Sequence, residues 1–324
     1  MNRLVAAVAL AAALVGLSTW LVQGYPSRPI TIVVPFPEGG PTDVIARAMA
    51  KHMRASLRQS VIIENVTGEN GNVGVGQVAR AAPDGYTISI GHWSTHVVNG
   101  AVYRLPYDVL KDFEPISLIA SNSYLIVAKT AVPADDLESF IAWLKANPDK
   151  ASEGTAGAGS PQHVSGVFFQ NATGARFRFV TFDGAAPAMQ ALVAGNIDLI
   201  IDDPTSSLPQ VRKGRIKAFA VTAGSRLKAA PDIPTVDEAG LSGFYFSRWH
   251  ALWAPKDTPK DVIAKLNDAA VRALADPYVS SQLADLGQEI FPRGQQTPEA
   301  LGAYHKAEVE RWWPIIKAAG IKVN

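Results

Sequence analysis

The sequence predicts an α/β protein of two lobes with a cleft between them, each lobe a mixed, mostly parallel sheet flanked by helices. Strand-like apolar runs alternate with helical patterns along the chain, which is typical of such sheets. The alternation restarts after Asn147-Pro148-Asp149, and each half opens with a strand, a Gly/Pro loop and a helix. The length of 324 residues also suggests two domains, because a domain usually has about 150 residues.

The first half contains five expected strands and three expected helices. Asp43 is a good N-cap for the first of these helices, and Pro83-Asp84-Gly85 forms a turn before the third strand. The strands are expected at 30–34, 61–63, 86–90, 116–119 and 124–128, and the helices at 43–57, 73–81 and 136–147.

The second half repeats this rhythm and then becomes mainly helical. Pro187 falls in the first turn of its helix, where proline is tolerated, and Pro231 to Gly243 has the composition of a linker. Strands are expected at 152–156, 177–181, 198–201, 216–222 and 249–254, and helices at 161–173, 185–195, 205–214, 259–275, 277–286, 297–306 and 307–319.

We expect the chain to cross between the lobes twice, near Tyr124 and near Trp249. The first lobe then comprises residues 25–124 plus 249–324, and the second comprises 125–248. Ligands of open α/β sheets bind beyond the carboxyl ends of the strands, and clefts between domains are favoured binding sites.

The N-terminus has the pattern of an export signal over residues 1–24. Arg3 supplies the positive start, residues 4–17 are apolar and alanine-rich, and Val22-Gln23-Gly24 suits cleavage before Tyr25. The alternative is a retained membrane anchor, since the apolar stretch nears the ~18–20 residues needed to span a bilayer. Cleavage would place the mature protein in the periplasm.

The composition excludes several classes of function. Lys and Arg number 30 and Asp and Glu 29, so no global positive field attracts nucleic acid or an anionic membrane. The chain has no cysteine, which excludes disulfides, thiolate catalysis and thiolate metal sites. A bound anion must therefore be held by local donors.

The most informative segment is the strand-to-helix loop within residues 30–43. A β-branched run ends in Pro35-Phe36-Pro37-Glu38-Gly39-Gly40-Pro41-Thr42-Asp43, and a helical pattern follows at once. Free backbone N–H groups and the positive end of a helix dipole make such a loop a natural site for a carboxylate or phosphate. Thr42 adds a hydroxyl donor, whereas Glu38 would repel an anion unless it points outward. The alternative is a plain connection between strand and helix.

A second glycine loop runs from Gly154 to His163. Ser160 suits the N-cap and Pro161 the first helical position, so capping explains Ser160 as well as ligand binding does. Gly157 and Gly159 could begin a dinucleotide-binding G-x-G-x-x-G motif, but Gln162 stands where the third glycine belongs.

A third strand-to-helix turn contains Phe182-Asp183-Gly184. Asp183 either caps the following helix or accepts a hydrogen bond from a ligand. Asp202 and Asp203 end a buried strand, and adjacent strand residues point to opposite faces, so their spacing does not make them a catalytic pair.

No motif predicts an enzyme, a metal site or a cofactor. His92 and His96 lack an accompanying metal-binding pattern. The chain has no G-x-S-x-G elbow, P-loop or kinase motif, and we expect Trp312 and Trp313 to pack in the core.

In combination and order, the motifs from Tyr25 to the C-terminus resemble the substrate-binding proteins of tripartite tricarboxylate transporters, the Bug family. The resemblance is carried by Tyr25-Pro26-Ser27-Arg28-Pro29-Ile30, the 34–43 loop, Leu105-Pro106-Tyr107-Asp108, Asp112-Phe113-Glu114-Pro115-Ile116, Gly159-Ser160-Pro161-Gln162-His163, and Asp232-Ile233-Pro234-Thr235-Val236-Asp237-Glu238-Ala239-Gly240.

The resemblance implies a type II periplasmic binding protein fold whose two lobes close on a small carboxylate. It also implies that the protein delivers this ligand to the permease subunits of a membrane transporter. It also implies no enzymatic activity, and we expect a monomer. By position, the ligand-binding residues would be Phe36, Gly39, Gly40, Thr42 and Asp43 in the first loop, Thr95 and His96 at the far end of the pocket, and Ser160, His163, Phe182, Asp183, Gly184 and Asp203 in the second lobe.

Two residues depart from the family pattern and make the cleft more negative. Glu38 stands where Ala or Pro is usual, and Asp183 often has Lys or Arg as its counterpart. This favours a monocarboxylate, a long dicarboxylate with one end outward, or a ligand with an amine or hydroxyl near Asp183.

A carboxylate sensor that presents itself to a signalling receptor, and an exported α/β hydrolase, remain the alternatives from other classes.

Overall fold

The computed structural model describes residues 24–148 and 150–322. The predicted export signal, and its alternative as an anchor, lie outside the described residues except for Gly24. Among the described residues, no helix combines the length and the hydropathy that crossing a bilayer requires.

The elements of the first half follow the predicted order. They are β1 (Ile30–Val34), α2 (Pro41–Leu57), β2 (Val61–Asn65), η1 (Glu69–Gly71), α3 (Asn72–Ala79), β3 (Thr87–His92), η2 (Ser94–Val98), α4 (Asn99–Val102), β4 (Phe113–Ser123), β5 (Leu125–Lys129) and α5 (Leu137–Ala146).

The remaining elements complete both lobes. They are β6 (Ser152–Thr155), α6 (Pro161–Thr173), β7 (Arg178–Thr181), α7 (Ala185–Val193), β8 (Leu199–Asp202), α8 (Pro204–Arg212), β9 (Ile216–Val221), β10 (Ser247–Pro255), α9 (Lys260–Leu274), α10 (Pro277–Asp285), β11 (Glu289–Ile290), η3 (Arg293–Gln295) and α11 (Pro298–Ala318).

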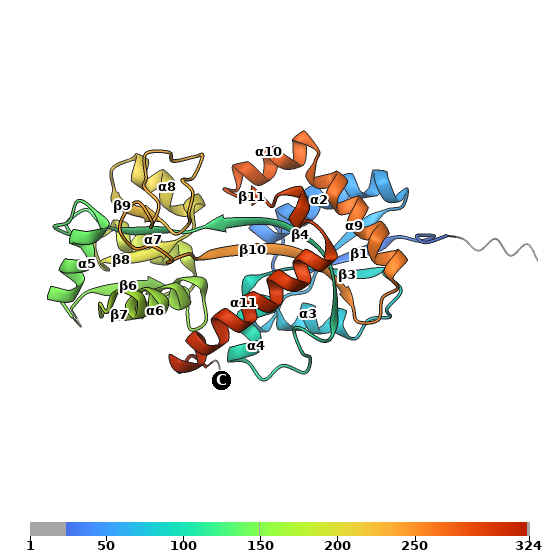
Figure 1. Ribbon diagram of the computed structural model, residues 1–324, viewed down its shortest axis with the longest axis horizontal. Helices are drawn as coiled ribbons and strands as arrows, with labels where there is room; N and C mark the ends of the chain where they lie inside the picture. Colours follow the sequence, from blue (N-terminus) through green and yellow to red (C-terminus); the bar gives the residue numbers. More distant parts are fainter. Residues whose placement is uncertain (1–23, 149, 323–324) are drawn as a thin grey trace, which may run out of the picture.

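Two mixed sheets form the centres of two lobes (Figure 1). The first has the strand order β11-β4-β10-β3-β1-β2, and the second has the order β7-β6-β8-β5-β9. The pairs β1–β2, β1–β3, β6–β7 and β6–β8 are parallel, and the other described pairs are antiparallel. The two-lobed α/β prediction is confirmed. Parallel pairing is less dominant than expected, because the strands that pass between the lobes enter each sheet antiparallel to their neighbours.

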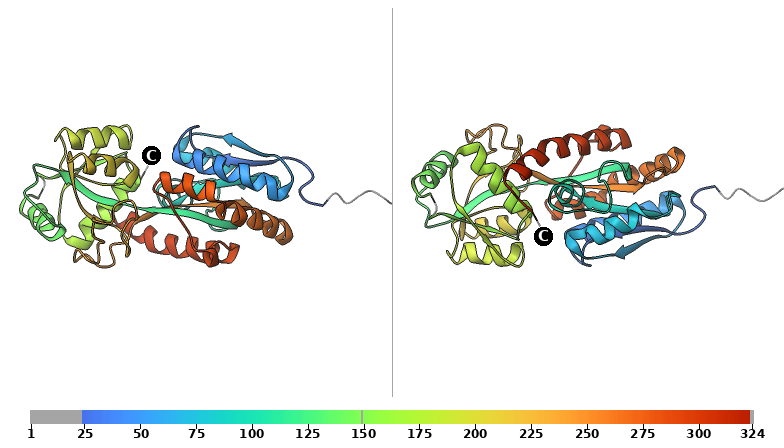
Figure 2. Two further views of the ribbon diagram at one scale, coloured as in Figure 1. Left: turned by 90° about the horizontal axis from the view of Figure 1, so that it is seen from above. Right: turned by 90° about the horizontal axis from the view of Figure 1, so that it is seen from below.

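The paired strands β4 and β10 form a ribbon that runs from one lobe to the other (Figures 1 and 2). β4 leads into β5 of the second sheet, and β9 of that sheet is followed by β10 of the first. The segment between β9 and β10 stays against the second lobe, where the Phe246 backbone N–H donates to the Thr222 carbonyl at 3.1 Å. The boundaries at residues 124 and 249 remain our proposal for dividing the lobes.

In the part of the chain that the structure describes, apolar side chains gather in three clusters. One lies between the first sheet and helices α2 and α9 and includes Ile32 and Leu266. A second lies under α7 and α8 in the second lobe and includes Leu192. The largest cluster joins residues of both sheets and includes Trp312 of α11. The Trp312 residue is 1% exposed. The C-terminal helix therefore packs across the junction of the lobes, and the prediction of a core role for Trp312 is confirmed.

Two predicted helix boundaries are wrong. Asp43 is not the N-cap of α2, because the helix begins at Pro41 and Gly40 occupies the cap position. The helices expected at 297–306 and 307–319 are one continuous helix, α11, which contains Pro314. No Gly or Pro separates the two predicted segments, so nothing in the chain ends the helix there.

Candidate functional site

The loop after β1 is held in place by the buried carboxylate of Asp43. This carboxylate accepts hydrogen bonds from the Gly39 backbone N–H at 2.9 Å, from Arg47 Nε at 2.8 Å and from Asn65 Nδ2 at 2.9 Å. Burial alone would raise the pKa of Asp43, but the hydrogen bonds from Arg47, Gly39 and Asn65 hold it below its usual range. Asp43 thus supports the loop through three hydrogen bonds within the protein, and its expected contact with a ligand remains a prediction.

The same loop leaves the first turn of α2 without a side-chain cap. Gly40 is the N-cap, and within residues 24–148 and 150–322 no side chain caps the first N–H groups of the helix. These groups have no partner within a helix, so they are free to bind an anion. Gly39 supplies the turn with a φ of 78°, which favours glycine. Glu38 points outward, since its side chain is 77% exposed and pairs with Arg47 at 3.0 Å.

Two histidines that the sequence reasoning did not assign to the site lie beneath this loop. The Phe36 ring stacks on His92 with centroids 4.5 Å apart, and the Thr42 hydroxyl lies 3.2 Å from His250 Nε2. Burial lowers the pKa of both histidines, that of His250 to about 3. Both rings are therefore neutral at pH 7. His92 Nδ1 accepts from the Ser94 N–H at 3.0 Å, which leaves its proton on Nε2.

The structure places Thr95 and His96, the residues expected at the far end of the pocket, in buried positions. The His96 ring is fully buried and stacks on Trp253 with centroids 3.6 Å apart. The Thr95 hydroxyl donates to the His92 carbonyl at 2.9 Å and accepts from the His92 N–H at 3.0 Å. Both residues lie in a turn of π-helix over residues 94–98, whose side chains are buried. Their contact with a ligand remains a prediction.

The Gly154–His163 loop of the second lobe confirms the predicted cap. Ser160 Oγ accepts from the His163 backbone N–H at 3.3 Å, and Pro161 begins α6. His163 Nδ1 accepts from the Gly159 N–H at 3.2 Å, so the neutral ring offers Nε2–H as a donor. A Cβ at Gly159 would lie 3.7 Å from Val98 and Val102. The loop therefore reaches the first lobe.

The turn before α7 is uncapped, like that before α2. Gly184 is the N-cap, with φ 124° and no side-chain hydrogen bond. Asp183 is exposed and does not cap the helix, so that interpretation is wrong; glycine takes the cap position because its φ is unfavourable for other residues. Phe182 is half-buried, and its N–H donates to the Thr155 carbonyl at 2.9 Å.

Asp203 joins the lobes at the base of the site. It caps α8 by accepting from the Thr205 N–H at 2.9 Å. Its other oxygen accepts from Asn122 Nδ2 of β4 and, at 2.8 Å, from Arg248 of β10. The neighbouring Asp202 instead accepts from Gln162 Nε2 at 3.0 Å. The two aspartates thus have different partners, as the strand pattern predicts.

Asn122 and Arg248 were missed by the sequence reasoning. Each lies within a strand that looks structural, and they are separated by more than a hundred residues. The only sequence signal is a polar side chain near each predicted crossing. Several buried polar atoms near them have no partner among the described residues: Asn122 Oδ1, Arg248 Nε, His250 Nδ1 and Gln162 Oε1.

A cavity of about 830 Å³ lies between the lobes, beside Pro204 and Thr205 at the start of α8. Its walls come from α8 and residues 225–229 on one side and from α10 and residues 287–290 on the other. A Cβ at Gly287 would lie 3.4 Å from Thr205 Cγ2, so the lobes nearly touch at this point.

The arrangement supplies uncharged donors from both lobes: two uncapped helix N-termini, hydroxyls and neutral histidines. Such donors can replace the water around one carboxylate. Among the described residues, no group of three or more His, Asp or Glu side chains is placed to hold a metal ion.

Comparison with known proteins identifies the group to which these features belong. The family model described as "Tripartite tricarboxylate transporter family receptor" matches residues 45–321. Protein BugT of Bordetella pertussis is 31% identical over 327 residues, covering 100% of this chain and 99% of BugT.

Two solved structures from Rhodopseudomonas palustris are also similar. MatC with bound malate is 37% identical, with a TM-score of 0.76 over 90% of this chain and 100% of MatC. Rpa4515 with adipate is 32% identical, with a TM-score of 0.77 over 92% of this chain and 99% of Rpa4515.

Proposed function

We propose, because this chain belongs to the tripartite tricarboxylate transporter receptor family, that it captures one small organic carboxylate between its lobes and delivers it to the permease of such a transporter. The family and its solved members are periplasmic solute-binding proteins and not enzymes. The hydrolase alternative is therefore wrong. MatC and Rpa4515 were solved with carboxylates, malate and adipate, which supports the same class of ligand here.

The observation that carries the proposal is the start of α2, which has no side-chain cap among the described residues and follows a loop held by Asp43. Phe36, Gly39, Gly40 and Thr42 would grip the carboxylate from the first lobe. Ser160, His163, Phe182 and Gly184 would close on it from the second lobe, with Asp183 and Asp203 near its other end. The ligand carboxylate loses little free energy when water is excluded, because the N–H and O–H donors of the protein replace its hydrogen bonds to water.

The charges around the site favour a ligand with one bound carboxylate. The histidines beneath the loop are neutral, and the guanidinium of Arg248 is paired with Asp203. A second or third buried carboxylate would have no free cation among these residues. We therefore propose a monocarboxylate, or a dicarboxylate whose second group stays in solvent or meets a hydroxyl.

The family supports a proposal about location and partners. We propose export to the periplasm with cleavage before Tyr25, action as a monomer, and contact with permease subunits in the membrane. A gene deletion of the permease that abolishes uptake of the bound acid would support transport, and uptake that persists would favour a sensor.

The direct test is a thermal-shift screen of the mature protein against small mono-, di- and tricarboxylates. A ligand stabilises the folded form by RT ln(1 + [L]/Kd), so 100 Kd of ligand adds about 2.7 kcal/mol. We expect at least one acid with one or two carboxylates to raise the Tm. A response confined to tricarboxylates, or to no acid, would contradict the proposal.

A further inference from the structure

The ribbon of β4 and β10 has two different faces. Arg248 pairs with Asn122 and Ser247 pairs with Ser123 across the strands. Because successive strand side chains point to opposite faces, Asn122, Arg248 and His250 share one face, which we call the cleft face. Asp203 and Thr42, from different lobes, contact this cleft face.

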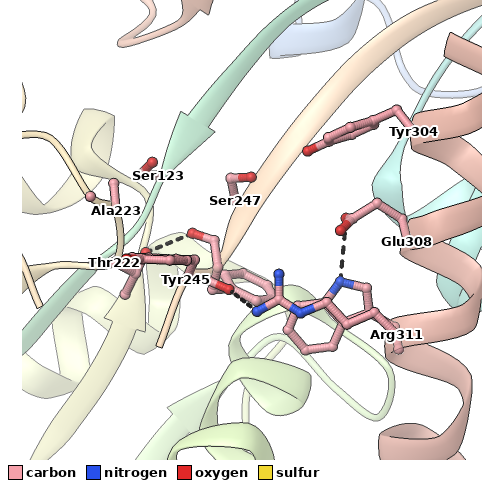
Figure 3. A pocket seen from close by; sticks show the side chains of 11 residues that line it. Ser123, Thr222, Ala223, Tyr245, Ser247, Tyr304, Glu308 and Arg311 are labelled. Carbon is pink, nitrogen blue, oxygen red and sulfur yellow. Dashed lines mark hydrogen bonds between the residues drawn. The ribbon is translucent and has the colours of Figure 1, made fainter. Parts of the chain in front are cut away.

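The opposite face, the back face, lines a second cavity of about 270 Å³ (Figure 3). Ser123 and Ser247 form its floor, and α11 covers it with Tyr304, Glu308 and Arg311. Residues 222–224 and Tyr245, which lie against the second lobe, complete the wall.

The walls of this cavity are tied to both lobes. Glu308 accepts from the indole N–H of Trp249, on the back face, at 3.0 Å and from that of Trp312 at 3.3 Å. Arg311 donates to the Tyr245 carbonyl at 2.7 Å. The Trp312 ring meets Phe168 of α6 edge-on at 5.2 Å. Helix α11 thus bridges the junction behind the ribbon.

We propose that this back cavity sets the balance between the open and closed forms of the protein. When the ribbon bends to bring the lobes together on the cleft face, the groups on the back face move apart, and the cavity widens. Opening the cleft compresses the cavity. A side chain that fills the cavity therefore disfavours the open form and favours the closed one.

The inference rests on the proposed capture of a ligand between the lobes, since closure is what binds it. The apparent Kd of a ligand that binds only the closed form equals its intrinsic Kd divided by the closed fraction, so a larger closed fraction lowers the apparent Kd. Filling the back cavity should tighten binding without any change to the residues that contact the ligand.

The test measures the distance between the lobes without ligand. The chain has no cysteine, so labels can be attached at Lys213→Cys and Ser280→Cys alone. Both positions are exposed, Lys213 at the end of α8 and Ser280 on α10, on either side of the larger cavity. Electron–electron double resonance then gives the distribution of distances for Ser247→Ala, Ser247→Val and Ser247→Phe.

We expect the distances to match the wild type in Ser247→Ala and to shorten progressively in Ser247→Val and Ser247→Phe. Ser123→Val, on the facing strand, should act like Ser247→Val if the Phe variant does not fold. Ser60→Phe, at an exposed position, is the control. Unchanged or longer distances in the folded, filled variants would overturn the proposal. Because no ligand is present, this outcome is independent of the acid screen.

Discussion

Arg248 of β10 and Asp203 at the start of α8 form an ion pair of 2.8 Å that links the strand ribbon to the second lobe. The side chains are only 18% and 12% exposed, and Asn122 of β4 binds the same carboxylate oxygen. A pair this buried is expensive to break, because removing one partner leaves the other charge uncompensated.

Replacing only the cation should therefore destabilise the protein strongly. We expect Arg248→Met to lower the free energy of unfolding by about 3 kcal/mol, measured by urea denaturation. The double variant Arg248→Met/Asp203→Asn should recover most of this loss, because asparagine is neutral and still caps α8. A single variant within 1 kcal/mol of wild type, on the order of a surface pair, would contradict this interpretation.

The buried histidines should make the protein less stable in acid. Burial lowers the pKa of His305 to about 4, from an unfolded value of about 6.5. Between these values the unfolded chain binds a proton that the folded chain does not, so stability falls as the pH falls. The contribution over this range is about 3 kcal/mol.

The variant His305→Gln isolates this contribution, because its amide can still donate to the His96 carbonyl that His305 Nε2 contacts. Its unfolding free energy should decline less than that of wild type between pH 6.5 and 4. Buried Glu153, whose pKa burial raises, acts in the opposite direction in both proteins and cancels in the comparison. Parallel curves for the two proteins would show that His305 does not titrate in this way.

The loop that holds the first carboxylate should depend on Asp43 and not on Glu38. Both acids bind Arg47, but the Asp43 side chain is 1% exposed and the Glu38 side chain is 77% exposed. We expect Asp43→Asn to cost about 1–3 kcal/mol at pH 7 by urea denaturation and Glu38→Gln to change the free energy of unfolding by less than about 1 kcal/mol.

The pH dependence of the same residue has a definite sign. The folded pKa of Asp43 lies below its unfolded value, so its contribution is present above the unfolded pKa and is lost as the pH falls through the folded one. The difference between wild type and Asp43→Asn should shrink in acid. If Asp43→Asn and Glu38→Gln changed the free energy of unfolding equally at pH 7, Asp43 would not support the loop as we infer.

Local sequence patterns predicted most of the elements, because each strand, turn and cap here is built from neighbouring residues. The Ser160 cap and the loop before α2 are examples. The patterns could not place Asn122 beside Arg248, since that contact depends on the pairing of two crossing strands. They also could not show that His96 stacks on Trp253, because nothing local distinguishes a histidine on an open loop from one stacked in the core.

The central claim is that the start of α2 binds the ligand carboxylate, and Gly40→Val tests it most directly. Gly40 has a φ of −73°, which valine can adopt, and a Cβ there would lie 3.3 Å from the Pro37 carbonyl oxygen. The valine methyl groups would cover the free N–H groups. The φ of residue 40 imposes no strain, and the tight contact with the Pro37 oxygen requires a shift of that turn by a few tenths of an ångström. Gly294→Val, where no atom lies within 4 Å of an added Cβ, is the matched control.

The decisive measurement is isothermal titration calorimetry of both variants with the acid that gives the largest thermal shift in wild type. We expect Gly294→Val to bind as wild type does, and Gly40→Val to remain folded and lose at least about tenfold in affinity, or ~1.4 kcal/mol. Unchanged affinity in a folded Gly40→Val protein would place the carboxylate elsewhere and contradict the account.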